Sequence, residues 1–96
     1  MYLITITYTQ PLVAVERVLE AHRQYLREAP LASRIVMTGR RRPATGGLVM
    51  LRADSRKAVE DFVRSDPYCT ENVAAFEIVE FDVAQVAPGL EALKGD

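Results

Sequence analysis

The stretch Ser65-Asp66-Pro67-Tyr68-Cys69 separates two segments of different periodicity, and it decides how the second half of the chain folds. A helical apolar pattern runs up to it, and a strand-like run at residues 75–81 follows it. Because Pro67 disfavours helical backbone angles at the residue before it, the preceding helix should end near Ser65. Asp66 then occupies a corner, where a carboxylate can cap the turn at Pro67 or orient a partner side chain in a cleft.

The composition is that of one small globular domain covering residues 1–96. The chain is 49% hydrophobic and 26% charged, and its net charge of −1 argues against general nucleic-acid binding. A domain of this size buries only about 60–65% of its unfolded surface, so a second copy would help to stabilise it. We expect no membrane span and no leader segment. The single cysteine, Cys69, cannot form an intramolecular disulfide, which favours a reducing, cytoplasmic location.

Hydrophobic periodicity predicts the order β-α-β-β-α-β. The expected strands are residues 2–9, 34–41, 48–51 and 75–82, and the expected helices are residues 12–29 and 56–64. This order is that of the α+β, ferredoxin-like fold, with a four-stranded antiparallel sheet and two helices on one face. The tail at residues 83–96 could form a short helix, fray, or contact a partner chain.

Residues 48–51, Leu-Val-Met-Leu, are apolar on both faces of the expected strand. One face packs under the helices, and the other would remain in water in a monomer. A second copy that packs sheet against sheet is the simplest cover. We therefore predict a homodimer.

His22 is the only histidine, and it lies on the apolar stripe of the first expected helix. A buried imidazole needs partners for its ring nitrogens, and Asp66 is the obvious candidate. The plainer alternatives are a core histidine bonded to a backbone carbonyl and an aspartate that only caps the turn at Pro67.

Three short motifs, in this order and on this βαββαβ pattern, resemble the YciI-like (YCII-related domain) family. They are Ala21-His22-Arg23-Gln24-Tyr25-Leu26, Gly39 late in the second strand, and Ser65-Asp66-Pro67-Tyr68 followed by Phe76-Glu77-Ile78. The resemblance implies a dimeric α+β barrel whose cleft holds a histidine and an aspartate as a proposed catalytic pair, here His22 and Asp66. The chain departs from the family at Gly39-Arg40, where members often have Gly-Pro, which bears on the shape and charge of the pocket rim.

Further candidate residues surround this pair. Tyr8, Tyr25, Gly39 and Arg40 are candidate substrate-binding residues, with packing as the default role of both tyrosines. The Arg40-Arg41-Arg42 run could clamp a carboxylate or phosphate, or it could be a solvated turn. Cys69 is read as a small half-buried residue rather than a nucleophile. No ligand cluster has metal-binding spacing, so no metal and no cofactor are expected.

The favoured hypothesis is a small enzyme that acts by proton transfer on a small anionic molecule. His22 would be the general acid/base and Asp66 would orient it, which suits lyase, isomerase or hydrolase-like chemistry. The alternative is a non-catalytic dimeric module that binds a small ligand or a protein. An oxygenase is a third reading, which rests on fold analogy alone.

Overall fold

The computed structural model describes residues 1–94, so the last two residues of the predicted tail, 95–96, lie outside the described residues. The strands are β1 (Tyr2–Tyr8), β2 (Ile35–Arg40), β3 (Gly46–Leu51) and β4 (Ala74–Glu80). The helices are α1 (Leu12–Glu28), α2 (Arg56–Arg64) and α3 (Pro67–Thr70), with short 3₁₀ helices η1 (Ala32–Arg34) and η2 (Glu91–Lys94). Within residues 1–94, no helix has the length and apolar character needed to cross a membrane.

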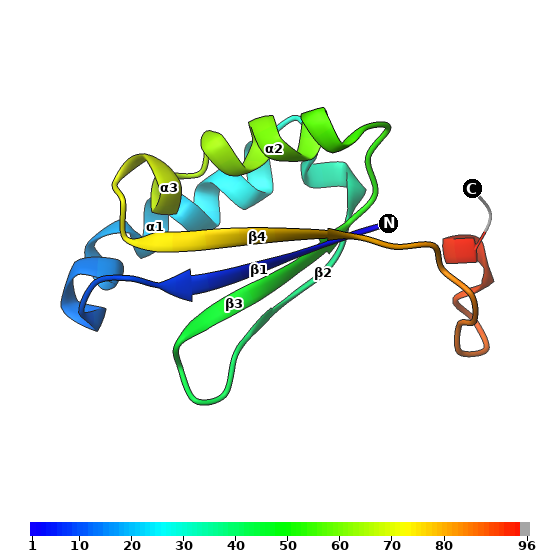
Figure 1. The fold of residues 1–96 in the computed structure, drawn as a ribbon, viewed down its shortest axis with the longest axis horizontal. Coiled ribbons are helices and arrows are strands. Elements are labelled where there is room, and N and C mark those ends of the chain that lie inside the picture. Colours follow the sequence, from blue (N-terminus) through cyan, green and yellow to red (C-terminus); the bar gives the residue numbers. More distant parts are fainter. Residues whose placement is uncertain (95–96) are drawn as a thin grey trace.

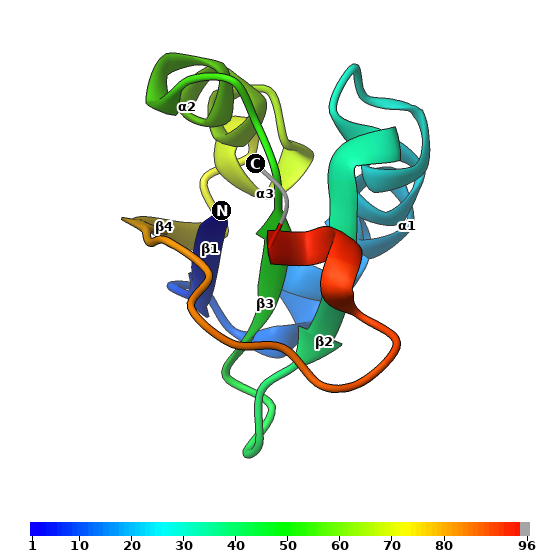
Figure 2. The ribbon, with the colours of Figure 1, turned by 90° about the vertical axis from the view of Figure 1, so that its right-hand side faces the viewer.

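The four strands form one sheet in the order β2-β3-β1-β4, and every neighbouring pair is antiparallel. The helices α1, α2 and α3 lie together on one side of this sheet (Figures 1 and 2). The predicted ferredoxin-like α+β fold is therefore confirmed. The dimeric form of the predicted barrel stays a prediction.

The core forms where the sheet meets the helices. Along β1, the even-numbered side chains point toward the helices, and Ile4 is almost completely buried there. Leu51 on β3 and Val59 on α2 are fully buried in the same layer. Helix α2 begins where the sequence predicts it, because the Ser55 hydroxyl accepts a 3.1 Å hydrogen bond from the Ala58 backbone N–H.

The corner at residues 65–70 contains a short helix, where the sequence predicts only a turn. Asp66 is the N-cap of α3, and its Oδ1 accepts a 2.8 Å hydrogen bond from the Tyr68 backbone N–H. Pro67 occupies the first helical position, which suits its fixed φ and missing N–H. The cap predicted for Asp66 is present, and it begins a one-turn helix.

The β2–β3 connection brings glycines against the central strand. A Cβ on Gly46 would lie 1.7 Å from the Ile6 carbonyl oxygen, so only glycine fits this position without a shift of the backbone. Gly46 pairs with Thr7 of β1, which extends β3 two residues beyond the run at 48–51 that the sequence predicts.

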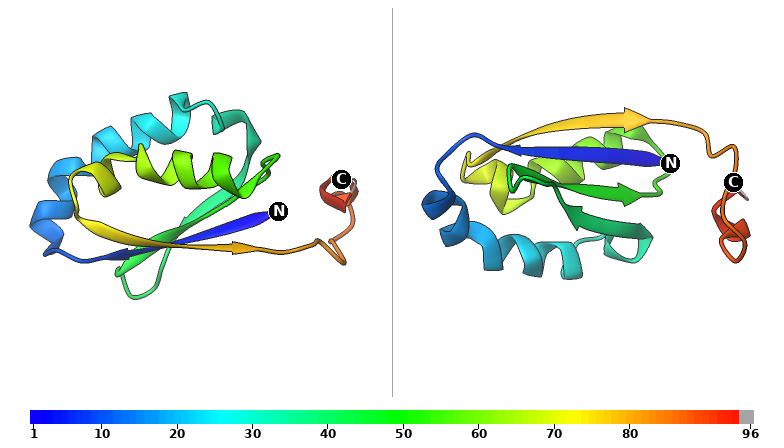
Figure 3. Two further views of the ribbon diagram at one scale, coloured as in Figure 1. Left: turned by 45° about the horizontal axis from the view of Figure 1, so that its top comes forward. Right: turned by 90° about the horizontal axis from the view of Figure 1, so that it is seen from below.

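The other face of the sheet carries an apolar row that crosses all four strands. Strand register aligns these side chains in the order Met37, Met50, Leu3 and Val79. The two outer members are 55% and 41% exposed. Seen from below, the strands lie in front and the helices lie behind them (Figure 3, right).

Candidate active site

Helix α1 and the α3 corner bring His22 and Asp66 together across 44 positions of sequence. The His22 Nδ1 lies 2.9 Å from each oxygen of the Asp66 carboxylate. Since a carboxylate can only accept hydrogen bonds, Nδ1 carries the proton and donates it, and Nε2 is the nitrogen left for other partners. Both residues are buried, with His22 8% and Asp66 2% exposed.

The Tyr68 ring lies flat against the imidazole. The two ring centroids are 3.9 Å apart and the planes differ by 3°. Tyr8, at the end of β1, also contacts Tyr68. The two rings meet edge-on, with their centroids 5.9 Å apart. Three aromatic side chains from β1, α1 and α3 thus form one packed group.

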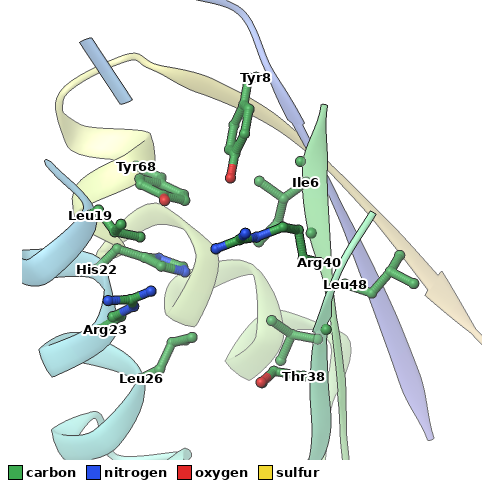
Figure 4. Close-up of a pocket in the computed structure, with 14 residues that line it drawn as sticks. Ile6, Tyr8, Leu19, His22, Arg23, Leu26, Thr38, Arg40, Leu48 and Tyr68 are labelled. Carbon is green, nitrogen blue, oxygen red and sulfur yellow. The ribbon is translucent and has the colours of Figure 1, made fainter. Parts of the chain in front are cut away.

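A cavity of about 250 Å³ opens between α1 and the β2–β3 half of the sheet. Its wall includes the imidazole of His22, the phenol groups of Tyr8 and Tyr68, and the guanidinium groups of Arg23 and Arg40 (Figure 4). Apolar side chains and strand backbone complete it: Ile6, Leu19, Leu26, Thr38, Gly39, Gly46, Gly47, Leu48 and Val49. The cavity wall therefore combines an imidazole, two phenol groups and positive charge with apolar side chains.

Comparison with known families matches the chain to the YCII-related domain over residues 1–82. The protein belongs to the YCII-related domain family. The resemblance drawn from the three motifs is thus confirmed over most of the chain.

One solved structure supports the fold of this YCII-domain protein. It is 5-chloro-2-hydroxyhydroquinone dehydrochlorinase (TftG) from Burkholderia phenoliruptrix AC1100, in complex with 2,5-dihydroxybenzoquinone. The match has a TM-score of 0.66 and 22% sequence identity, and it covers 84% of this chain and 93% of that chain. At this identity the likeness establishes a shared fold and nothing more. No match was found among curated proteins.

The structure separates the four predicted substrate-binding residues of the YCII-domain protein. Tyr8, Gly39 and Arg40 line the cavity beside His22. Tyr25 lies elsewhere, because its hydroxyl donates a 2.6 Å hydrogen bond to the Phe62 carbonyl and its ring stacks on Phe62. Tyr25 lines a second, mostly apolar cavity of about 330 Å³ between α1 and α2.

The three arginines of the Arg40-Arg41-Arg42 run lie in different surroundings. Arg40 lies on the helix-facing side of β2 and lines the cavity, whereas the Arg41 guanidinium donates a 2.9 Å hydrogen bond to the Thr7 hydroxyl. Arg42 is exposed and does not line this cavity. Of the three arginines, for which the sequence left both an anion clamp and a solvated turn open, only Arg40 lines the cavity with His22.

Two further residues of the cavity wall were not among the sequence candidates. Arg23 follows His22 on α1, and it is exposed although it lines the cavity. Tyr68 stands out in the sequence only as part of the Ser65-Asp66-Pro67-Tyr68 motif. Tyr68 could have been predicted from its position two residues after the N-cap Asp66. A residue at that position donates its backbone N–H to the cap carboxylate and therefore lies close to it.

Within residues 1–94, no group of three or more His, Cys, Asp or Glu side chains is placed to hold a metal ion. Cys69 is free and half-buried within α3.

Burial raises the pKa of the Tyr68 phenol far above its ordinary value, and interaction with the Tyr8 hydroxyl and the Asp66 charge raises it further. Because the folded state holds this proton more tightly than the unfolded chain, the stabilising contribution is complete below the unfolded pKa of about 10 and is lost as the pH rises through the folded pKa.

We therefore expect the free energy of unfolding to fall as the pH rises above about 10, and to fall less steeply in Tyr68→Phe. Urea unfolding at a series of alkaline pH values measures both slopes. Some slope should remain in the variant, since the pKa values of Tyr2 and Tyr25 are raised as well. Equal slopes in the two proteins would contradict the prediction.

Proposed function

We propose that this protein is an enzyme that moves a proton on a small anionic organic molecule. His22 acts as the general acid/base through Nε2, and Asp66 holds the ring and stabilises the imidazolium that forms. The observation that carries the proposal is the pair of 2.9 Å contacts from Nδ1 to Asp66, made by a histidine that also lines a cavity. An imidazole fixed in this way can take a proton from a bound molecule and return it at neutral pH.

The charge of the cavity wall supports an anionic substrate. The Arg40 side chain reaches from β2 toward His22 and the Tyr8 hydroxyl (Figure 4). Within residues 1–94, neither Arg40 nor Arg23 has an ion pair or hydrogen bond, and no carboxylate lines the cavity. A guanidinium without a protein partner is well suited to bind a carboxylate, phenolate or phosphate oxygen.

The cavity volume limits the substrate to a small molecule. About 250 Å³ accommodates a ring with a few substituents, and the dehydrochlorinase of the same fold is found with 2,5-dihydroxybenzoquinone. We therefore place acidic hydroxylated rings and small carboxylic acids first among candidates. Elimination, isomerisation and hydrolysis all need the proton transfer that His22 would supply.

The test is a screen of such compounds with purified protein in D₂O, followed by proton NMR. Exchange of a carbon-bound proton, or conversion of the compound, is the expected result. Arg40→Gln should raise KM about 10-fold or more because it removes a charge-assisted hydrogen bond. Arg42→Gln is the matched control and should leave KM unchanged. Equal effects of the two substitutions would show that Arg40 does not bind the substrate.

A second candidate function is ligand binding without chemistry. The observation in its favour is that Asp66 already caps α3, so the contact with His22 also serves the fold. This function predicts compounds that bind and shift protein resonances but are recovered unchanged, without deuterium.

We also infer that the protein is a homodimer in which two sheets pack face to face. The support is the apolar row Met37, Met50, Leu3 and Val79, which lies on the face opposite the helices. Burial of this row against its copy removes apolar surface from water, which favours association. Sedimentation equilibrium measures the oligomeric state, and a monomer at high micromolar concentration would contradict the inference.

A further inference from the structure

We propose that Tyr68 is the positioning residue of the site: its ring fixes the plane of the His22 imidazole so that Nε2 is directed into the cavity. This inference rests on the proposed function of His22. It assigns a role to a residue that is 3% exposed and whose ring lies 3.9 Å from the imidazole, centroid to centroid, with the planes nearly parallel.

The hydrogen bond to Asp66 holds Nδ1 but sets the tilt of the imidazole plane only loosely. Both carboxylate oxygens lie 2.9 Å from Nδ1, and such a two-oxygen acceptor tolerates small rotations of the ring about the Cβ–Cγ bond. The outer torsion of histidine has no sharp preference that would stop this motion. A flat aromatic surface in contact with one face of the ring does stop it, because turning would break the stacked contact.

A single short segment supplies both constraints. Asp66 provides the acceptor, and Tyr68, two residues later, provides the stacking surface and donates its backbone N–H to the same carboxylate at 2.8 Å. Pro67 between them fixes the first helical position of α3. Tyr8 packs edge-on with the Tyr68 ring, at 5.9 Å between centroids, and so supports its position.

The other polar groups near the imidazole cannot take over this role. Arg23 and Arg40 line the cavity, but both are exposed, and flexible charged side chains do not fix a ring plane. The phenol hydroxyl is not required for stacking, so a phenylalanine should serve as well as the tyrosine. Comparing Tyr68→Phe with the wild type therefore distinguishes the role of the aromatic ring from that of the hydroxyl.

The experiment uses the single histidine, whose ¹⁵N-labelled ring nitrogens give unambiguous NMR signals in the whole protein without ligand. At a pH at which the ring is neutral, the wild-type protein should show one tautomer, with the proton on Nδ1 and slow solvent exchange of that proton. Tyr68→Phe should match the wild type. Tyr68→Leu should show mixed tautomers and at least 10-fold faster exchange of the Nδ1 proton. With any substrate found, Tyr68→Leu should lower kcat more than it changes KM.

Several results would overturn the proposal. One is a wild-type ring protonated on Nε2, and another is a folded Tyr68→Leu protein with the wild-type tautomer and exchange rate. If Tyr68→Leu does not fold, Tyr68→Met tests the same point, since methionine is flexible enough to fill an irregular gap but offers no flat surface. The NMR result is independent of turnover. A fixed ring in a protein that converts no compound would leave this inference standing and reject the catalytic function.

Discussion

Replacing His22 with asparagine should lower kcat by about 10²–10⁴-fold, the usual contribution of a general acid/base, while the protein keeps its fold. The asparagine amide can still donate a hydrogen bond to Asp66, so the α3 corner retains its partner. An amide cannot gain or lose a proton at neutral pH, and proton transfer is thereby removed. The measurement is turnover of any compound found in D₂O, together with thermal unfolding of the variant.

Cys69→Ala is the control for the histidine substitution, because Cys69 is a free thiol close to the same corner. It should keep full turnover, since the proposed mechanism uses no thiol. Loss of activity in Cys69→Ala would move the chemistry to the sulfur. An unfolded His22→Asn protein, or a folded one with unchanged turnover, would indicate that His22 serves the structure alone.

Introducing a charge into the apolar row should separate the two subunits. Val79→Glu places a carboxylate next to Leu3, at the β4 end of the apolar row in the proposed sheet-to-sheet interface. Removing that charge from water costs several kcal/mol when no partner is present. The dimer dissociation constant should therefore rise by about 10²–10³-fold, since each 1.4 kcal/mol is a factor of ten. Sedimentation equilibrium over a range of concentrations measures the change.

Val13→Glu is the matched control for this substitution. Val13 is on α1, on the opposite side of the sheet, and it is 59% exposed against 41% for Val79. The same change of residue there should leave the dimer intact. If both variants remain dimeric, the subunits meet through another surface.

The fold could be predicted from the sequence because alternation and helical spacing are local signals. Helix α2 begins and ends at the predicted residues, since Ser55 caps it and its apolar stripe is regular. Strand β3 was predicted too short, because Gly46 and Gly47 carry no side-chain pattern. They belong to the strand because the backbone at Gly46 lies close against β1, at a distance that only glycine allows. Helix α3 was missed because four residues are too few for a periodicity to appear.

The candidate site was only partly predictable, for a different reason. The His22–Asp66 contact was expected from the need of a buried imidazole for a partner. Tyr25 shares the buried side of α1 with His22, and only the position of α2 decides that its hydroxyl donates to Phe62. The place of Tyr68 likewise depends on how α3 packs against α1. Such contacts between distant segments leave no trace in local spacing.

The two walls of the cavity differ in how freely they can change. On the α1 side, Asp66 begins helix α3 and holds the imidazole of His22 with the same carboxylate, so a mutation of Asp66 disturbs the local fold and the position of the ring together. On the β2 side, Gly39 and Arg40 are exposed, and a Cβ at Gly39 would meet no neighbouring atom within 4 Å. Under the proposed function, variation in substrate preference can therefore accumulate along β2 at little cost to stability, while the proposed His22–Asp66 pair opposite stays the same.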